Sequence, residues 1–201
     1  MNNKIVVGIS GFARSGKDTL AVLLSNKLSN LNLNVKILSF AFSLKKDIDD
    51  FCKNKIGISS FTEETELKSK IRPILIAYGA SQRQISGGRY WLDKLRPEVD
   101  SFFSEGGDVV IVPDLRFKEY DFDEYDFIKS YPNNVIITVS KILENGNQNP
   151  AAHESESKNL PFFLERSDFN LTWDSSNSEE YLNRKTEKCL SIVKSKLSIH
   201  E

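Results

Sequence analysis

Apolar residues along this chain follow two alternating patterns. Five short apolar runs are typical of strands that are buried on both faces: residues 5–9, 35–40, 109–114, 135–139 and 169–173. The stretches between them predict helices over about residues 20–31, 44–54, 73–85, 90–106 and 179–199. Strands that alternate with helices predict an α/β fold, with a five-stranded parallel sheet between helices on both faces, in three layers. A ligand cleft is then expected at the carboxyl edge of the strands.

The segment after the first run predicts a phosphate-binding loop. Residues 11–19 read Gly-Phe-Ala-Arg-Ser-Gly-Lys-Asp-Thr, so a glycine and four residues precede Gly16 and Lys17. Backbone N–H groups of such a loop surround phosphate oxygens, the lysine reaches the terminal phosphates, and the next helix points its positive end at the anion. We therefore expect ATP contacts from the loop residues Gly11, Ala13, Arg14, Ser15, Gly16, Lys17, Asp18 and Thr19.

Two aspartates are candidate magnesium contacts. The residue after the loop lysine is usually Ser or Thr, whose hydroxyl binds Mg²⁺, but here it is Asp18. The third apolar run ends at Asp114, and a carboxylate at the end of a buried strand commonly lies near the metal in phosphate-loop proteins. Asp18 and Asp114 are therefore predicted to contact Mg²⁺, either directly or through a water molecule.

Composition narrows the class of protein. A chain of 201 residues predicts one domain over residues 1–201, and a net charge of −1 argues against sequence-independent binding to nucleic acid. Cys52 and Cys189 match no metal-binding spacing and favour a reducing compartment. With no export signal or membrane span in the pattern, we expect a cytoplasmic protein, in the host cytoplasm if it is viral, with no membrane partner.

The middle and later parts of the chain are less regular. The acidic segment 62–66 suits a helix N-terminus, and Pro73 predicts that a largely buried helix restarts there and runs to about Ile85, because proline is tolerated in a first helical turn. Arg72 and Arg83 are about three turns apart, so both could face one cleft.

Acidic and aromatic residues over 119–126 predict an exposed helix. Residues 141–158, rich in Asn, Gly, Ser and Glu, predict a mobile loop or lid.

Several motifs, in order along the chain, resemble the deoxynucleoside monophosphate kinases of phages and other large DNA viruses. They are Arg14–Thr19 with its unusual Asp, Phe40–Ala41 with Leu44–Lys45, Arg72, Leu75, Gly79, Tyr90–Trp91, Lys94–Leu95, Val112–Arg116, and His153–Glu156 before Leu160–Pro161. The resemblance runs from residue 4 to about residue 173 and implies a P-loop kinase fold. Phe42–Ser43 and Lys141 depart from it, since the family often has Asp-Pro and Arg there.

The resemblance implies a role for each region and a set of ligands. An acceptor-binding helical region would cover about residues 42–105 and a lid about residues 141–160. The family's activity would make ATP, Mg²⁺ and a deoxynucleoside monophosphate the ligands, and the oligomeric state stays open, with a homodimer as one option. Lys17, Arg14 and Arg116 would be catalytic, and the implied substrate contacts are Lys45, Arg72, Gly79, Arg83, Trp91 and Arg116.

Alternatives remain open at this stage. Phosphomevalonate kinases of the animal type share the Gly-Lys-Asp loop, so the loop alone is compatible with another small phosphorylated acceptor. The chain could also be a nucleotide-binding switch or ATPase module, although its acceptor-side arginines have no obvious task there. Trp91 fits a core position as well as a base contact, because tryptophan is well buried on average.

Overall fold

Five strands form one parallel sheet in the order β2-β3-β1-β4-β5. The computed structural model describes residues 4–152, 154–174 and 179–197. The strands are β1 (Ile5–Gly11), β2 (Val35–Ile37), β3 (Val109–Leu115), β4 (Asn134–Ile142) and β5 (Phe169–Asp174). In the register, Val7 of the central strand β1 lies between Ile111 of β3 and Val135 of β4. The carboxyl end of β1 therefore lies in the middle of the sheet edge.

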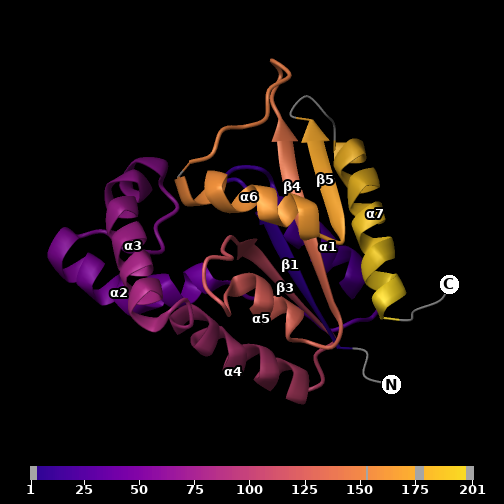
Figure 1. The fold of residues 1–201 in the computed structure, drawn as a ribbon, viewed down its shortest axis with the longest axis horizontal. Coiled ribbons are helices and arrows are strands. Elements are labelled where there is room, and N and C mark those ends of the chain that lie inside the picture. The colour runs from indigo at the N-terminus through magenta and orange to yellow at the C-terminus, as the bar shows by residue number, and fades with distance from the viewer. Residues whose placement is uncertain (1–3, 153, 175–178, 198–201) are drawn as a thin grey trace.

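Helices cover both faces of the sheet, as predicted (Figure 1). Ile5, Val7 and Ile9 of β1 pack in one core with α1 (Lys17–Ser29) and α7 (Glu179–Lys196). Val6 faces the other way, into a second core with α4 (Tyr90–Ser104), α5 (Glu124–Lys129) and α6 (Glu154–Arg166). Successive side chains of a strand point to opposite faces, so one apolar run supplies both cores. The three-layer α/β fold is confirmed.

Two long helices form a lobe beside the sheet (Figure 1). They are α2 (Phe40–Ile56) and α3 (Thr65–Ser86), and α3 packs mainly against α2 and α4. The predicted restart of a helix at Pro73 was wrong, because α3 begins at Thr65, within the predicted N-terminal segment, and runs through this proline without ending. The expected burial was also wrong: residues 74–78 are half-buried or exposed, since α3 covers other helices and not the sheet.

The start of α2 also differs from the sequence prediction. The expected strand over 35–40 ends at Ile37, and α2 begins at Phe40 instead of near Leu44. Two side chains fix this start. Ser39 caps the helix by accepting a hydrogen bond from the Phe42 N–H at 3.0 Å, and the Asp114 carboxylate accepts from the N–H groups of residues 40 and 41.

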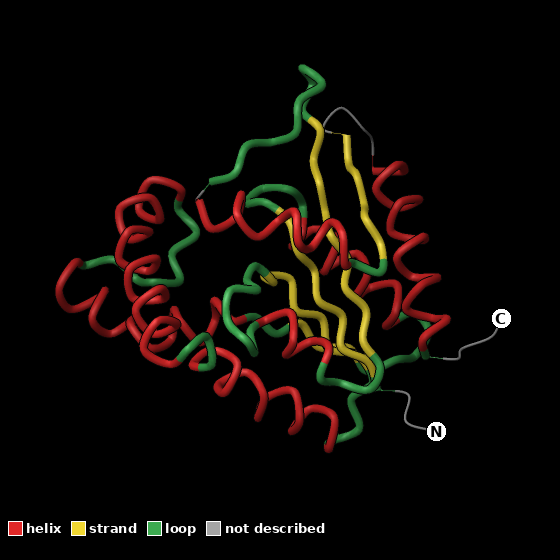
Figure 2. Tube along the Cα trace, in the orientation of Figure 1, coloured by secondary structure: helices red, strands yellow, loops and turns green. Residues whose placement is uncertain are grey.

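The lid that the sequence predicts over about residues 141–160 would span the end of β4, the loop that follows it and the start of α6 (Figure 2). The β4 strand continues to Ile142, where a turn allows a single antiparallel bridge to Gln148. Residues 154–160 belong to α6, so the second part of the predicted lid is a helix. His153, which belongs to the lid motif, lies outside the described residues, as do residues 198–199 of the predicted last helix. In the described part of the chain, no helix is long and apolar enough to cross a membrane.

Candidate functional site

The phosphate loop connects β1 to α1 and depends on two glycines. Gly11 has φ +142°, and a Cβ there would lie 2.2 Å from the carbonyl oxygen of Val139. Gly16 has φ +93°, and a Cβ there would lie 2.9 Å from Nε1 of Trp173. Neither position therefore accommodates a side chain, and the loop is pressed closely against β4 and β5. This geometry fits the predicted phosphate-binding loop.

Lys17, the first residue of α1, is buried at the end of this loop. Its ammonium group donates a hydrogen bond to the carbonyl oxygen of Phe12 at 2.7 Å. Burial, with the nearby charge of Arg116, lowers the pKa of Lys17 to about 8. Three carboxylates act in the opposite direction on this pKa: Glu156, Asp18 and Asp114. Charged groups from β3, α1 and α6 thus converge on the loop lysine.

Asp114 lies at the end of β3 and is held by backbone groups of α2. Its Oδ2 accepts from the Ala41 N–H at 2.8 Å and its Oδ1 from the Phe40 N–H at 3.2 Å. Burial raises the pKa of Asp114, and the charge of Asp18 raises it further. Two carboxylates that repel each other favour a divalent cation between or beside them.

These aspartates fit the way in which kinases hold magnesium. Among the described residues, no group of three or more His, Cys, Asp and Glu side chains could enclose a metal ion. Mg²⁺ in kinases is usually bound by only one or two carboxylates together with substrate phosphates and water. Asp18 and Asp114, which influence each other electrostatically beside Lys17, match that donor set.

A cavity of about 330 Å³ opens beside the phosphate loop. Residues 14–19 of the loop line it, together with Lys141 of β4, Trp173 and Asp174 of β5, and Leu182 of α7. Its volume lies at the lower end of the range for small-molecule sites. Six of the eight predicted ATP contacts therefore border one cavity: Arg14, Ser15, Gly16, Lys17, Asp18 and Thr19.

Trp173 is a cavity residue that sequence reasoning missed. It belongs to an apolar run that was interpreted only as a strand, and it is 3% exposed. Its indole Nε1 is buried and has no hydrogen-bond partner in the described part of the chain. The available signal was position, because a residue at the end of β5 must lie at the same sheet edge as the loop that follows β1.

The predicted acceptor cations lie apart from this cavity, whose lining includes neither Arg72, Lys45 nor Arg116. Arg72 is exposed on α3 and forms no ion pair within the ranges that the structure describes. Lys45 of α2 is half-buried, with its Nζ 5.7 Å from the centre of the Phe61 ring. Arg116 follows β3, and its Nη1 lies 3.5 Å from Oε1 of Glu156. Of the three, only Arg116 influences the pKa of Lys17.

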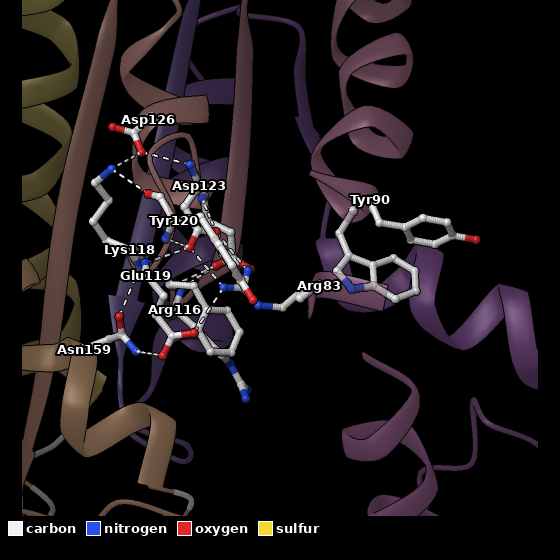
Figure 3. Close-up of polar contacts among 12 residues, drawn as sticks. Arg83, Tyr90, Arg116, Lys118, Glu119, Tyr120, Asp123, Asp126 and Asn159 are labelled. Carbon is white, nitrogen blue, oxygen red and sulfur yellow. Dashed lines mark hydrogen bonds and ion pairs between the residues drawn. The ribbon is translucent and has the colours of Figure 1, made fainter. Parts of the chain in front are cut away.

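Arg83 is engaged in a buried cluster of charges (Figure 3). Its Nη1 and Nη2 donate to the two carboxylate oxygens of Asp123 at 2.8 and 3.0 Å. Its guanidinium also lies 3.7 Å from the centre of the Phe117 ring. With a bidentate partner and a stacked ring, Arg83 is not free to bind an acceptor phosphate. It also does not share an exposed face with Arg72, because Arg83 is 5% exposed.

The acidic segment 119–126 is not the exposed helix that was predicted. Asp123 is 0% exposed and Glu124 is 3% exposed, because both face the Arg83 guanidinium. The Glu124 Oε2 accepts from the backbone N–H of Arg116 at 2.7 Å and of Phe117 at 3.0 Å. Burial raises the pKa of Glu124 to about 8. Glu124 therefore fixes the backbone from which the Arg116 side chain extends.

Trp91 and Gly79 serve the packing of helices in this structure. Trp91 is 3% exposed, meets the rings of Tyr78 and Tyr90 edge-on, and donates from Nε1 to the carbonyl oxygen of Gly79 at 3.3 Å. A Cβ at Gly79 would lie 2.7 Å from Cδ1 of Leu44, so this glycine lets α2 approach α3. These placements favour the core interpretation of Trp91 over a base contact.

Comparison with known proteins yields similarity of structure only. No protein-family model matches the sequence, and no curated protein matches it. An APS kinase from Mycobacterium tuberculosis aligns with TM-score 0.47 and 12% identity, over 95% of this chain and 97% of its own. A shikimate kinase from Bacteroides thetaiotaomicron gives 0.47 and 13%, over 94% and 98%. A gluconokinase from Sinorhizobium meliloti gives 0.47 and 12%, over 100% of both chains. At identities this low, the alignments show a similar arrangement of helices and strands and do not indicate the substrate.

Proposed function

We propose that this protein transfers a phosphoryl group from ATP to the phosphate of a deoxynucleoside monophosphate. The proposal rests on the cavity and the charged groups that surround Lys17. This buried lysine ends a glycine-dependent loop, borders a cavity of about 330 Å³, and lies within electrostatic reach of Arg116, Asp18 and Asp114. Such a site collects the charges that two phosphate groups need in order to approach each other.

The donor nucleotide would occupy the cavity beside the loop. Backbone N–H groups of the loop and the α1 N-terminus would bind its phosphates, and the Lys17 ammonium would exchange the Phe12 carbonyl for a phosphate oxygen. The cavity lining also includes the cationic Lys141 of β4 and the aromatic Trp173 of β5, which packs against Gly16. The positive charge of Lys141 suits the phosphates of a nucleotide.

Asp18 and Asp114 would hold Mg²⁺, which supplies neutralising charge to the donor phosphates when it is bound. An acceptor phosphate oxygen is already ionised, so the residues of this chain need not remove a proton from it. Their task is to position the two substrates and to stabilise charge. Arg14 and Arg116 would stabilise the transferring group, and Lys45 and Arg72 would bind the acceptor phosphate.

Deoxynucleoside monophosphates are proposed as acceptors because of the ordered motifs from Arg14 to Pro161, not because of any one contact. The Gly-Lys-Asp sequence of the loop is also compatible with another small phosphorylated acceptor. A nucleotide-dependent switch or ATPase would need the loop but not the acceptor cations. These two alternatives are outcomes of the experiment that follows.

The test is ADP release from ATP and Mg²⁺ with each deoxynucleoside and ribonucleoside monophosphate in turn, and with phosphomevalonate. We expect at least one deoxynucleoside monophosphate to stimulate ADP release, with formation of the diphosphate confirmed by chromatography. Stimulation by phosphomevalonate alone would assign a different acceptor. Slow ADP release that no acceptor changes would instead identify an ATPase or switch.

A further inference from the structure

One residue of the phosphate loop is held on both sides, by a side chain from the loop between β4 and α6 and by one from the first turn of α6. The Ala13 N–H donates to Oε2 of Glu156 at 3.1 Å, and the Ala13 carbonyl oxygen accepts from Nδ2 of Asn149 at 2.9 Å. Glu156 and Asn149 are 4% and 6% exposed. Both peptide groups that flank Ala13 are therefore fixed by buried side chains that lie more than 130 residues away in the sequence.

These two hydrogen bonds lie next to a residue with a strained backbone conformation. Arg14, which follows Ala13, has φ +62°, in the left-handed region that residues with side chains rarely adopt. Such a conformation costs free energy and persists only where the surroundings over-determine it. The two hydrogen bonds to Ala13 provide such surroundings, so they help to direct the exposed Arg14 side chain toward the cavity that it borders.

Glu156 also reaches the acceptor side of the proposed site. Its Oε2 accepts both the Ala13 N–H and the Ala152 N–H, at 3.1 and 3.0 Å. Its Oε1 is buried, has no hydrogen-bond partner among the described residues, and lies 3.5 Å from Nη1 of Arg116. One carboxylate thus contacts the donor loop with one oxygen and pairs with an acceptor-side cation through the other.

We propose that Glu156 is a positioning residue that holds the phosphate loop and Arg116 at a fixed separation, with Asn149 as a second support for the loop. The part that concerns Arg116 rests on the proposed phosphoryl transfer, while the part that concerns the loop does not. A carboxylate suits both contacts, because its two oxygens accept several hydrogen bonds and its charge pairs with the guanidinium. Glutamine would keep an oxygen for the loop but would lose the charge for Arg116.

The loop part is tested by amide hydrogen exchange at Ala13, which requires no activity. We compare the natural protein with Glu156→Gln, Glu156→Ala and Asn149→Ala, and use Glu165→Gln as the matched control because Glu165 is exposed at the other end of α6. The free energy of unfolding is measured for every variant, so that global opening can be separated from local opening. Ala13 should exchange at least tenfold faster in Glu156→Ala, while Glu156→Gln and Glu165→Gln should retain most of the protection.

The Arg116 part is tested by steady-state kinetics with a monophosphate that stimulates ADP release in the experiment described above. Glu156→Gln should raise the acceptor KM about tenfold with little change in the KM for ATP, since the charge that pairs with Arg116 is lost while an oxygen for the loop is kept. Asn149→Ala should raise the KM for ATP and leave the acceptor KM nearly unchanged. Glu156→Ala should raise both values.

The outcomes separate the two claims. Unchanged exchange of the Ala13 amide in Glu156→Ala would overturn the positioning of the loop, whatever the activity is. Equal losses of kcat in all three variants, with no split between the two KM values, would indicate a merely structural role and overturn the link to Arg116. Should the natural protein transfer phosphate to no acceptor, the proposed function and the Arg116 part fail together, and the exchange result still decides the loop part.

Discussion

The donor and acceptor sides of the proposed site are constructed in different ways. The donor side is one contiguous loop between β1 and α1, pressed against β4 and β5 so closely that Gly11 and Gly16 leave no room for a Cβ. The acceptor side draws Lys45, Arg72 and Arg116 from three separate elements, two of them in the lobe beside the sheet. The sheet therefore sets the donor geometry directly, whereas the acceptor geometry depends on how the lobe is attached.

The attachment of the lobe includes a buried ion pair. Arg83 extends from α3, and its partner Asp123 immediately precedes α5, which packs on the sheet. Glu124 continues this connection by holding the backbone N–H of Arg116. Glu124 thus connects the charge cluster around Arg83 to the backbone of the acceptor-side Arg116 (Figure 3). Substitutions in this cluster should disturb the acceptor side before the donor side.

The largest effect is expected from Arg83→Ala. Removal of this cation leaves Asp123 as a buried charge without its bidentate partner, and such losses typically cost about 3–5 kcal/mol. Urea denaturation should show this decrease in the free energy of unfolding. Arg89→Ala is the control, because Arg89 is exposed and its nearest carboxylate, on Asp93, is 3.8 Å away. A decrease below about 1 kcal/mol for Arg83→Ala would mean that the cluster does not secure the lobe.

Lys17→Ala should impair ATP binding and phosphoryl transfer and leave binding of the acceptor nearly unchanged. Loss of one preorganised charge at the transferring group typically lowers kcat by about 10²–10³-fold. ADP release and ATP affinity should both decrease, while binding of the acceptor monophosphate should be retained in calorimetry. Lys27→Ala is the matched control, since Lys27 lies in the same helix and pairs with Glu187 away from the loop. A variant Lys17→Ala with full turnover would remove the phosphate loop from the proposed chemistry.

The difference between the donor side and the acceptor side also explains how much of the structure the sequence could predict. The strands and the phosphate loop depend on residues that are neighbours in the chain, so apolar runs and glycine spacing were sufficient to predict them. Arg83 looked like a substrate contact because it lies about three helical turns after Arg72, a spacing that could place both arginines at one cleft. Its true environment comes from Asp123, which is 40 positions away and belongs to a segment that resembled an exposed acidic helix.

Long-range burial also explains the other differences. Glu156 meets Ala13 across 143 positions, and neither residue carries a local signal of that contact. Pro73 predicted the start of a helix from local geometry, but packing of α3 against α2 and α4 supports a helix that continues through it. Local preference is a weak guide where tertiary contacts outweigh it. Patterns in the sequence located the donor side, and only the folded chain reveals which charges are already paired.

Glu124→Gln tests the charge cluster near the acceptor side through the pH dependence of the free energy of unfolding. The pKa of Glu124 is raised by burial from an ordinary value of 4.5 to about 8, so the folded protein binds more protons than the unfolded chain between these values. Stability should therefore decrease as pH rises through that window, by at most about 1.4 kcal/mol per pH unit. Glutamine has no such titration, so the variant should show a flatter curve of unfolding free energy from pH 5 to pH 8. Parallel curves for the variant, the natural protein and Glu165→Gln would contradict a buried, protonated Glu124.

The smallest effect is expected from Arg72→Ala, which tests the exposed part of the acceptor side. Arg72 is exposed and lacks an ion pair in the part of α3 and its surroundings that the structure describes, so its removal should change stability by no more than about 0.5 kcal/mol. If it binds the acceptor phosphate, the acceptor KM should rise about tenfold while the KM for ATP stays constant. Lys68→Ala is the control on the same helix, where the lysine pairs with Glu63. Because both side chains are on the surface, an equal and small response of the two variants would remove Arg72 from the acceptor site and leave Lys45 and Arg116 as its proposed cations.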